Sequence, residues 1–376
     1  MIRPKEKHLM SPKWLAAATA AALALTVSAC GSSDDTSSAS TGSGSSTSTA
    51  PASLTGSGST FAAPIYQQIG SELKGKGLTI NYQPTGSGQG ISDLTNKSVD
   101  FAGSDPPMKD EEIAAAKKNG EPVHVPTAFG AITVSYNLEG VKTGLKLDGA
   151  TIADIYLGKV KKWNDPAIAK QNSGVSLPSS DITVVHRSDE SGTTKGFTGF
   201  LEGYSPEWKS KVGSDKTVKW PTGTGAKGND GVAAAVKQTP GSIGYVEQAY
   251  ALQNNFTFAS VKNKSGKYIV PTLESVTASG DGVDIPADLR FTITDSPNPT
   301  AYPISSQTFV VVYKDPCKAG GNKTKAAGLV SFLNYVLGTG QDTIKKLSYA
   351  PLPAAVDAKA KAAVQGLTCN GSPISG

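Results

Sequence analysis

The sequence has 376 residues, of which 38% are hydrophobic and 18% are charged, so it is long enough to form more than one hydrophobic core. Its formal net charge is +5, but four basic residues and one acidic residue lie in the first 29 positions. The remaining 32 basic and 30 acidic residues leave a charge of only +2. Such a balance argues against nucleic acid as a partner.

The first 29 residues are typical of a secretory signal peptide. Basic residues up to Lys13 precede an apolar run from Trp14 to Val27. Val27-Ser28-Ala29-Cys30 resembles a bacterial lipobox, whose cysteine is acylated after cleavage. We therefore expect Cys30 to anchor the mature chain by lipid to the extracytoplasmic face of the cell membrane. The alternative is an ordinary signal peptide with a leftover cysteine.

The next residues lack any apolar periodicity, and Ser, Thr, Gly, Ala and Asp make up almost all of them, which predicts a flexible tether over 30–53. From Leu54 onward, short β-like runs alternate with helix-like runs, which favours α/β layers. The pattern predicts strands at Thr79–Tyr82, Ala131–Tyr136, Ile182–His186 and Thr308–Tyr313, and helices at Asp110–Asn119, Thr151–Leu157 and Lys325–Leu337.

Two segments combine proline and small residues just before a β-like run: Val123–Gly130 and Ala301–Ser305. They are candidate crossings between two lobes, and ordinary loop-to-strand junctions are the alternative interpretation.

Two cysteines remain after Cys30, namely Cys317 and Cys369. In an exported protein we expect them to form a disulfide, with two buried free thiols as the alternative. His124 and His186 lie far from both cysteines in the sequence, so we predict no metal site and no cofactor.

Three loops rich in glycine and hydroxyl residues precede helix-like segments: Gly56–Phe61, Thr85–Gly90 and Asp189–Thr194. A helix start carries unpaired N–H groups and the positive end of the helix dipole, so it can hold an anion. A single loop of this kind is usually only an N-cap, but three in one chain favour an anion site.

Arginine is rare in this chain. After the signal segment only Arg187 and Arg290 accompany 30 lysines, and Arg187 stands immediately before the third loop. The planar guanidinium matches two oxygens of an oxyanion, which lysine cannot do. We interpret Arg187 as an anion ligand, with a surface arginine at a strand end as the alternative, and Arg290 as a surface residue.

An acidic residue, Asp105, lies in the segment Val99–Pro107. A carboxylate repels an oxyanion unless they share a proton, and hydrogen phosphate carries such a proton whereas sulfate does not. Asp105 is therefore a candidate selectivity residue, although a turn aspartate before proline is the alternative.

From about Leu54 to the C-terminus these features together resemble the periplasmic phosphate-binding proteins of phosphate-specific (Pst) ABC transporters. The resemblance rests on ordered motifs: Leu54–Phe61, Val99–Pro106, Asp154–Lys159, Arg187–Thr193, Lys219–Pro221, Lys227–Gly231 and Gly241–Tyr245.

The resemblance implies a two-lobed α/β fold of the type II periplasmic-binding-protein class with hinge strands. Residues 54–126 plus 305–376 would form one lobe, and 127–304 the other. It also implies phosphate ligands from both lobes, with Asp189 steering the guanidinium: Thr60, Phe61, Ser87, Asp105, Arg187, Asp189, Ser191, Gly192 and Thr193.

The sequence departs from the family pattern at Glu190, where glycine is frequent, and at Gly88-Gln89, which replaces a Ser-Gly pair. We expect His186 to serve packing or the surface, because strand alternation points it away from Arg187. We interpret the glycine-rich stretch Gly223–Gly231 as a structural turn.

By resemblance the chain is a monomeric receptor, not an enzyme, that docks on an ABC permease driven by a separate ATPase, since no Walker motif occurs here. The alternatives are a binding protein for another oxyanion, a surface interaction protein, and a phosphatase or serine hydrolase using Ser191. The last lacks the histidine or metal cluster that its chemistry needs.

Overall fold

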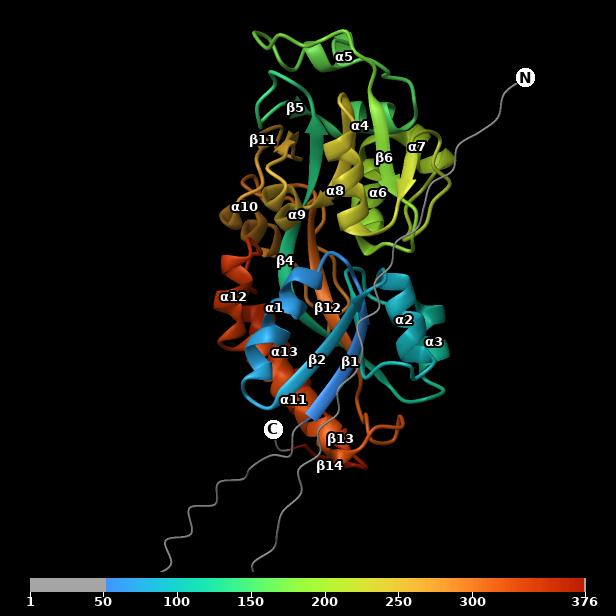
Figure 1. The fold of residues 1–376 in the computed structure, drawn as a ribbon, viewed down its shortest axis with the longest axis vertical. Coiled ribbons are helices and arrows are strands. Elements are labelled where there is room, and N and C mark those ends of the chain that lie inside the picture. The colour runs from blue at the N-terminus through green and yellow to red at the C-terminus, as the bar shows by residue number, and fades with distance from the viewer. Residues whose placement is uncertain (1–51, 375–376) are drawn as a thin grey trace, which may run out of the picture. The chain divides into compact units, whose positions relative to one another are not determined.

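The computed structural model describes residues 52–374, which fold as a two-lobed α/β protein (Figure 1). The predicted signal peptide, Cys30 and nearly all of the predicted tether lie outside these residues. The strands are β1 (Ala52–Gly58), β2 (Leu78–Pro84), β3 (Phe101–Ser104), β4 (Pro122–Asn137), β5 (Lys146–Leu147), β6 (Thr183–Arg187), β7 (Thr224–Ala226), β8 (Ser242–Glu247), β9 (Thr257–Phe258), β10 (Ser260–Lys262), β11 (Tyr268–Ile269), β12 (Ser305–Tyr313), β13 (Thr368–Cys369) and β14 (Ser372–Pro373).

The helices alternate with these strands along most of the chain. They are α1 (Ala63–Lys74), α2 (Ser87–Thr95), α3 (Asp110–Ala116), α4 (Gly149–Tyr156), α5 (Pro166–Ala169), α6 (Gly192–Tyr204), α7 (Pro206–Lys211), α8 (Gly228–Gln238), α9 (Gln248–Gln253), α10 (Leu273–Thr277), the 3₁₀ helix η1 (Ala278–Gly280), α11 (Lys323–Leu337), α12 (Gly340–Lys346) and α13 (Ala354–Gln365).

The main sheet of the described residues has nine strands, in the order β2-β1-β3-β12-β4-β8-β6-β7 with β9 paired to β4. β1 pairs in parallel with β2 and β3, and β6 pairs in parallel with β7 and β8. Between these groups β12 and β4 pair antiparallel with each other. Because β12 also pairs with β3 and β4 also pairs with β8, these two strands join the parallel groups.

We call β1–β3, α1–α3 and α11–α13 the first lobe, and α4, α6–α9 and β6–β8 the second lobe. Figure 1 shows β4 and β12 passing from one lobe into the other. Of the candidate crossings, Val123–Gly130 belongs to β4, whereas Ala301–Ser305 lies just before β12 and ends at its first residue. Arg290, upstream of β12, forms an ion pair with Asp110 of α3. The chain around Arg290 therefore lies against the first lobe.

The predicted strands and helices are all present, with shifted ends. The largest difference is β4, which begins at Pro122, well before the predicted run from Ala131 to Tyr136. Proline is disfavoured inside a central strand, because it has no N–H group to donate to the neighbouring strand. Here Pro126 is accommodated next to a register shift, where Pro126 pairs with Phe309 and Ala128 with Thr308.

Each lobe has an aromatic core next to the loops of interest. In the first lobe Tyr66 packs edge-on against Tyr82 and Phe101. In the second lobe Phe197 stacks on Tyr245, whose hydroxyl accepts a hydrogen bond from the Arg187 backbone N–H at 3.1 Å. This packing fixes the end of β6, where the third glycine-rich loop begins.

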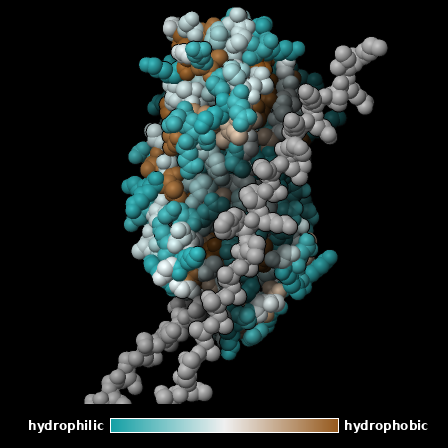
Figure 2. All heavy atoms as spheres, viewed as in Figure 1, coloured by the Kyte–Doolittle hydropathy of each residue, from teal (hydrophilic) through white to brown (hydrophobic). Residues whose placement is uncertain are grey.

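A disulfide joins Cys317 and Cys369, as predicted, and connects the loop after β12 to β13. Figure 2 shows mostly hydrophilic residues on the visible face, with hydrophobic ones scattered among them. Across residues 52–374 we find no helix with the length and apolar character needed to cross a membrane.

Candidate functional site

All three glycine-rich loops lead into helices. α2 begins at Ser87, and α6 begins at Gly192 after Ser191, whose Oγ accepts the N–H of Thr194 at 3.0 Å. α1 begins two residues after Phe61. The sequence prediction that each loop opens a helix is therefore confirmed.

Five backbone N–H groups of these loops are buried and free. Between residues 52 and 374 the following N–H groups donate to no protein acceptor: those of Thr60, Phe61, Ser87, Gly192 and Thr193. Buried N–H groups almost always have a partner, because an unpaired one loses its hydration without compensation. This set is therefore suited to an anion that supplies the missing acceptors.

Gly192 shows that the loops of the two lobes meet. A Cβ atom placed on it would lie 2.3 Å from Asp105 Oδ2 and 2.5 Å from Ser87 Oγ. Both of these atoms belong to the first lobe, whereas Gly192 opens α6 in the second. Only glycine allows the two lobes to approach this closely here.

Arg187 is buried, with 3% of its surface exposed, and it is held by Asp189. Nε donates to Oδ1 at 2.7 Å and Nη2 donates to Oδ2, while Nη1 donates to Thr193 Oγ1 at 3.4 Å. Burial raises the pKa of Asp189, but its bonds with Arg187 outweigh that effect and the net pKa lies below the ordinary value. The outer edge of the guanidinium is left for a ligand.

Asp105 is fully buried, and its two oxygens have different surroundings. Oδ1 accepts from Ser59 Oγ at 2.5 Å and from Thr308 Oγ1 at 2.9 Å, whereas Oδ2 has only a long contact of 3.4 Å with Ser87 Oγ. Burial raises the pKa of Asp105 to about 6, although these hydroxyls and Arg187 act to lower it. Oδ2 is thus an acceptor that can take a proton from a ligand.

The structure therefore brings together the nine candidate ligand residues, with Asp189 acting through Arg187. It also adds residues that the sequence reasoning missed. Ser59 belongs to the first loop and could have been chosen there, but Thr308 lies on β12 and carries no sequence signal. Asn229 lies in the stretch interpreted as a structural turn, yet it is the second residue of α8 and contacts Thr60.

Two further predictions concern residues outside the site. His186 stacks on Trp220 with ring centroids 4.6 Å apart, so its packing role is confirmed. Arg290 is confirmed as a surface residue that forms ion pairs with Asp110 and Asp288.

Comparison with known proteins places this site in a family. A model described as a PBP superfamily domain matches residues 43–339. The phosphate-binding protein PstS of Pasteurella multocida (strain Pm70) is 42% identical over 314 residues, covering 82% of this chain and 89% of that protein. PstS of Haemophilus influenzae (strain Rd) is 40% identical over 308 residues, with coverages of 81% and 90%.

The chain belongs to the PstS family. A solved phosphate-binding protein from Stenotrophomonas maltophilia has a TM-score of 0.64 at 20% identity and covers 83% of this chain and 93% of its own. At such low identity this likeness concerns the fold alone.

The two departures from the PstS sequence pattern lie against each other. Gly88 N–H donates to the Glu190 carbonyl at 3.0 Å, across the lobes. A Cβ on Gly88 would lie 2.5 Å from Glu190 Cβ and closer still to its carboxylate. The absence of a side chain at position 88 therefore makes room for Glu190.

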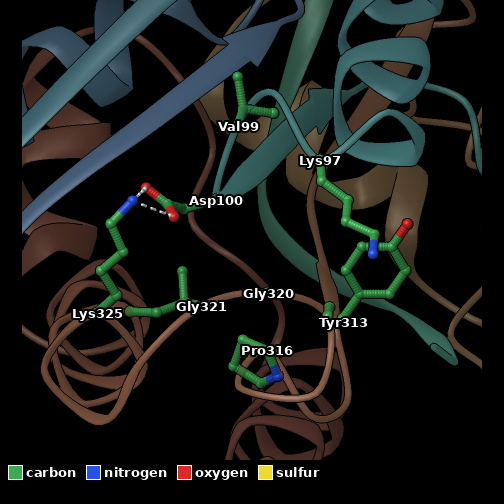
Figure 3. Close-up of a pocket in the computed structure, with 10 residues that line it drawn as sticks. Lys97, Val99, Asp100, Tyr313, Pro316, Gly320, Gly321 and Lys325 are labelled. Atoms are coloured by element: carbon green, nitrogen blue, oxygen red, sulfur yellow. Dashed lines mark hydrogen bonds and ion pairs between the residues drawn. The ribbon is translucent and has the colours of Figure 1, made fainter. Parts of the chain in front are cut away.

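A separate pocket lies between β12, α11 and the turn before β3 (Figure 3). It contains Lys97 and Lys325, but Lys325 Nζ is paired with Asp100 at 2.8 and 3.1 Å. The hydroxyl of Tyr313 already donates to the Leu94 carbonyl at 3.2 Å. Asp100 therefore offsets the charge of Lys325 but not that of Lys97.

No group of three or more His, Cys, Asp or Glu residues placed to hold a metal occurs in the described chain.

Proposed function

We propose that this chain binds inorganic phosphate outside the cytoplasmic membrane and delivers it to the permease of an ABC importer. Membership of the PstS family supports this role. The observation that carries it is the combination of five unpaired backbone N–H groups, the buried Arg187 guanidinium and the buried Asp105 carboxylate, whose Oδ2 has only one long contact.

The donors suit a tetrahedral anion. We assign the N–H groups of Thr60, Phe61, Ser87, Gly192 and Thr193 to phosphate oxygens, together with the hydroxyls of Thr60, Ser87, Ser191 and Thr193. The outer edge of Arg187 would bind two oxygens, because its inner edge is occupied by Asp189. In a site without water these charge-assisted bonds are strong.

Asp105 would select phosphate over sulfate. Its Oδ1 is already bonded to Ser59 and Thr308, so Oδ2 is the atom that would meet the ligand. Hydrogen phosphate has one P–OH proton to share with Oδ2. Sulfate has none at neutral pH, so its oxygens would face a carboxylate across a dry contact.

Closure of the lobes would complete the site. Thr60, Ser87 and Asp105 come from the first lobe, whereas Arg187 and Gly192 come from the second. We propose lobe boundaries at 54–126 plus 305–376 and at 127–304, with β4 and β12 as the crossings. Phosphate would favour the closed state because only that state presents both sets of ligands.

A binding role also fits the surroundings of Ser191. Its Oγ caps α6, and neither histidine of the described chain serves it as a base. His124 Nε2 accepts the Met108 N–H at 3.0 Å, and His186 is stacked on Trp220. We therefore propose a receptor and not a hydrolase.

The lipid anchor at Cys30, the location on the extracytoplasmic face of the membrane and the monomeric state are parts of the same proposal. The anchor and the location are tested together by expressing the chain and a Cys30→Ser variant in a strain deleted for its own phosphate-binding protein. We expect the wild type to restore phosphate uptake and to fractionate with membranes, and the variant to be released. Failure of the wild type to restore uptake, with normal phosphate binding in vitro, would contradict the importer role.

A further inference from the structure

Asn229 lies where the two lobes meet and is fully buried. Its side-chain Nδ2 donates to Thr60 Oγ1 at 2.9 Å and to Thr193 Oγ1 at 3.1 Å. Its backbone N–H also donates to Thr60 Oγ1, at 3.2 Å. Thr60 belongs to the first lobe and Thr193 to the second, so one amide group contacts a candidate ligand hydroxyl from each lobe.

The orientation of this amide is fixed by a third contact. Asn229 Oδ1 accepts the backbone N–H of Glu247 at 2.9 Å. A backbone N–H can only donate, so the atom that faces it must be the oxygen. Both protons of Nδ2 are therefore directed at the two threonine hydroxyls.

These bonds determine what the hydroxyls can do. A hydroxyl oxygen has two lone pairs and one proton. Thr60 Oγ1 accepts two N–H groups from Asn229, and Thr193 Oγ1 accepts one from Asn229 and one from Arg187 at 3.4 Å. With both lone pairs engaged, each hydroxyl can act only as a donor, and within residues 52–374 neither donates to a protein acceptor.

We propose that Asn229 is a positioning residue that directs the hydroxyl protons of Thr60 and Thr193 at the bound anion. This inference rests on the proposed phosphate-binding function and extends it to a residue outside the ligand set. Hydroxyls free to rotate could accept the P–OH proton in place of Asp105. Asn229 removes that option, and for Thr60 it does so only when the closed lobes bring this residue to α8.

The test is a double-mutant cycle measured by calorimetric titration with phosphate. Asn229→Ala should weaken binding by about 10- to 100-fold, the usual range for losing hydrogen bonds to a charged group. In a Thr60→Val, Thr193→Val background no hydroxyl remains to be directed. The same Asn229→Ala change should then weaken binding by no more than about 3-fold, since coupled residues lose their effect when the partner is absent.

Tyr250→Phe is the matched control. The Tyr250 hydroxyl, on α9, donates to the Thr60 carbonyl at 2.7 Å, so it also joins the first loop to the second lobe without touching either threonine hydroxyl. A substitution that only hinders closure should weaken phosphate binding by the same factor in both backgrounds. We expect this result for Tyr250→Phe. Thermal unfolding without phosphate checks that each variant is folded.

Asn229→Asp covers the case in which the alanine variant does not fold. The carboxylate keeps the acceptor for the Glu247 N–H, but it would accept the threonine protons and turn them away from the anion. We expect a greater loss than for alanine, again much reduced in the valine background. If either Asn229 variant loses the same factor of phosphate affinity in both backgrounds, the positioning role is overturned but the proposed phosphate binding is not. A wild type that binds no phosphate would overturn the proposed function itself.

Discussion

Arg187 and Asp189 form a two-point pair in which Nε and Nη2 of the guanidinium both donate to the carboxylate. Asp189 Oδ1 also accepts the Gly228 N–H at 3.1 Å, which connects the pair to the start of α8. The carboxylate thus holds the inner edge of the guanidinium, while Nη1 reaches Thr193 at the start of α6. The orientation of Arg187 is therefore set before any ligand arrives.

Arg187→Lys should weaken phosphate binding by about 10- to 100-fold, because an ammonium cannot pair with Asp189 and present two parallel donors at once. Arg290→Lys is the matched control, since it makes the same change at a surface ion pair with Asp110. We expect its phosphate affinity to equal that of the wild type in calorimetric titration. Equal losses in both variants would show that the effect is not local.

Gly192→Ala should weaken phosphate binding by about 10- to 100-fold, because its Cβ would overlap Asp105 Oδ2 and oppose closure of the lobes. Gly199→Ala lies on the same helix, where a Cβ would meet only Ser214 Oγ at 3.3 Å. Its affinity should stay close to that of the wild type. Normal phosphate binding by the Gly192 variant would mean that the two loops do not approach as described.

The contact between Gly88 and Glu190 predicts that a substitution at one position can compensate for a substitution at the other. Gly88→Ser alone should weaken binding, because its side chain would overlap Glu190. Glu190→Gly removes the obstacle, so the double variant should recover most of the wild-type affinity. Titrations of the wild type, both single variants and the double variant test this expectation, and additive losses would contradict it.

The pKa of Asp105 predicts how stability without phosphate depends on pH. Burial raises this pKa from 3.8 to about 6, so the folded state holds the proton more tightly than the unfolded state. The contribution of Asp105 to the free energy of unfolding is therefore greatest below about pH 4 and is lost as the pH rises through 6. This rise in the pKa corresponds to about 3 kcal/mol of stability.

Asp105→Asn removes this dependence and keeps the acceptor for Ser59 and Thr308. In urea unfolding without phosphate the variant should be more stable than the wild type at pH 7.5, and this advantage should shrink toward pH 4. A difference that does not change with pH would show that Asp105 keeps an ordinary pKa in the folded protein.

The sequence indicated much of this site because its main components are local. A glycine-rich loop before a helix can be seen in a few consecutive residues, and Arg187 is conspicuous in a chain rich in lysine. Length indicated more than one hydrophobic core and periodicity indicated α/β layers, whereas the periplasmic-binding-protein class with hinge strands came from the resemblance.

The sequence could not indicate the contacts that depend on the register of the strands or on the closure of the lobes. Thr308 reaches Asp105 only because β12 pairs with β3, across about 200 residues of sequence. Asn229 contacts Thr60 only when the lobes meet, so a local interpretation of its segment as a turn missed it. The complementarity of Gly88 and Glu190 is likewise a contact between lobes.

Calorimetric titration of the wild type and Asp105→Asn with phosphate and with sulfate tests the central claim most directly. The wild type should bind phosphate and show no measurable binding of sulfate, because Asp105 Oδ2 needs a proton from the ligand. The variant should lose much of this discrimination, since its amide can donate to an unprotonated oxygen. A wild type that binds sulfate about as tightly as phosphate would contradict the account.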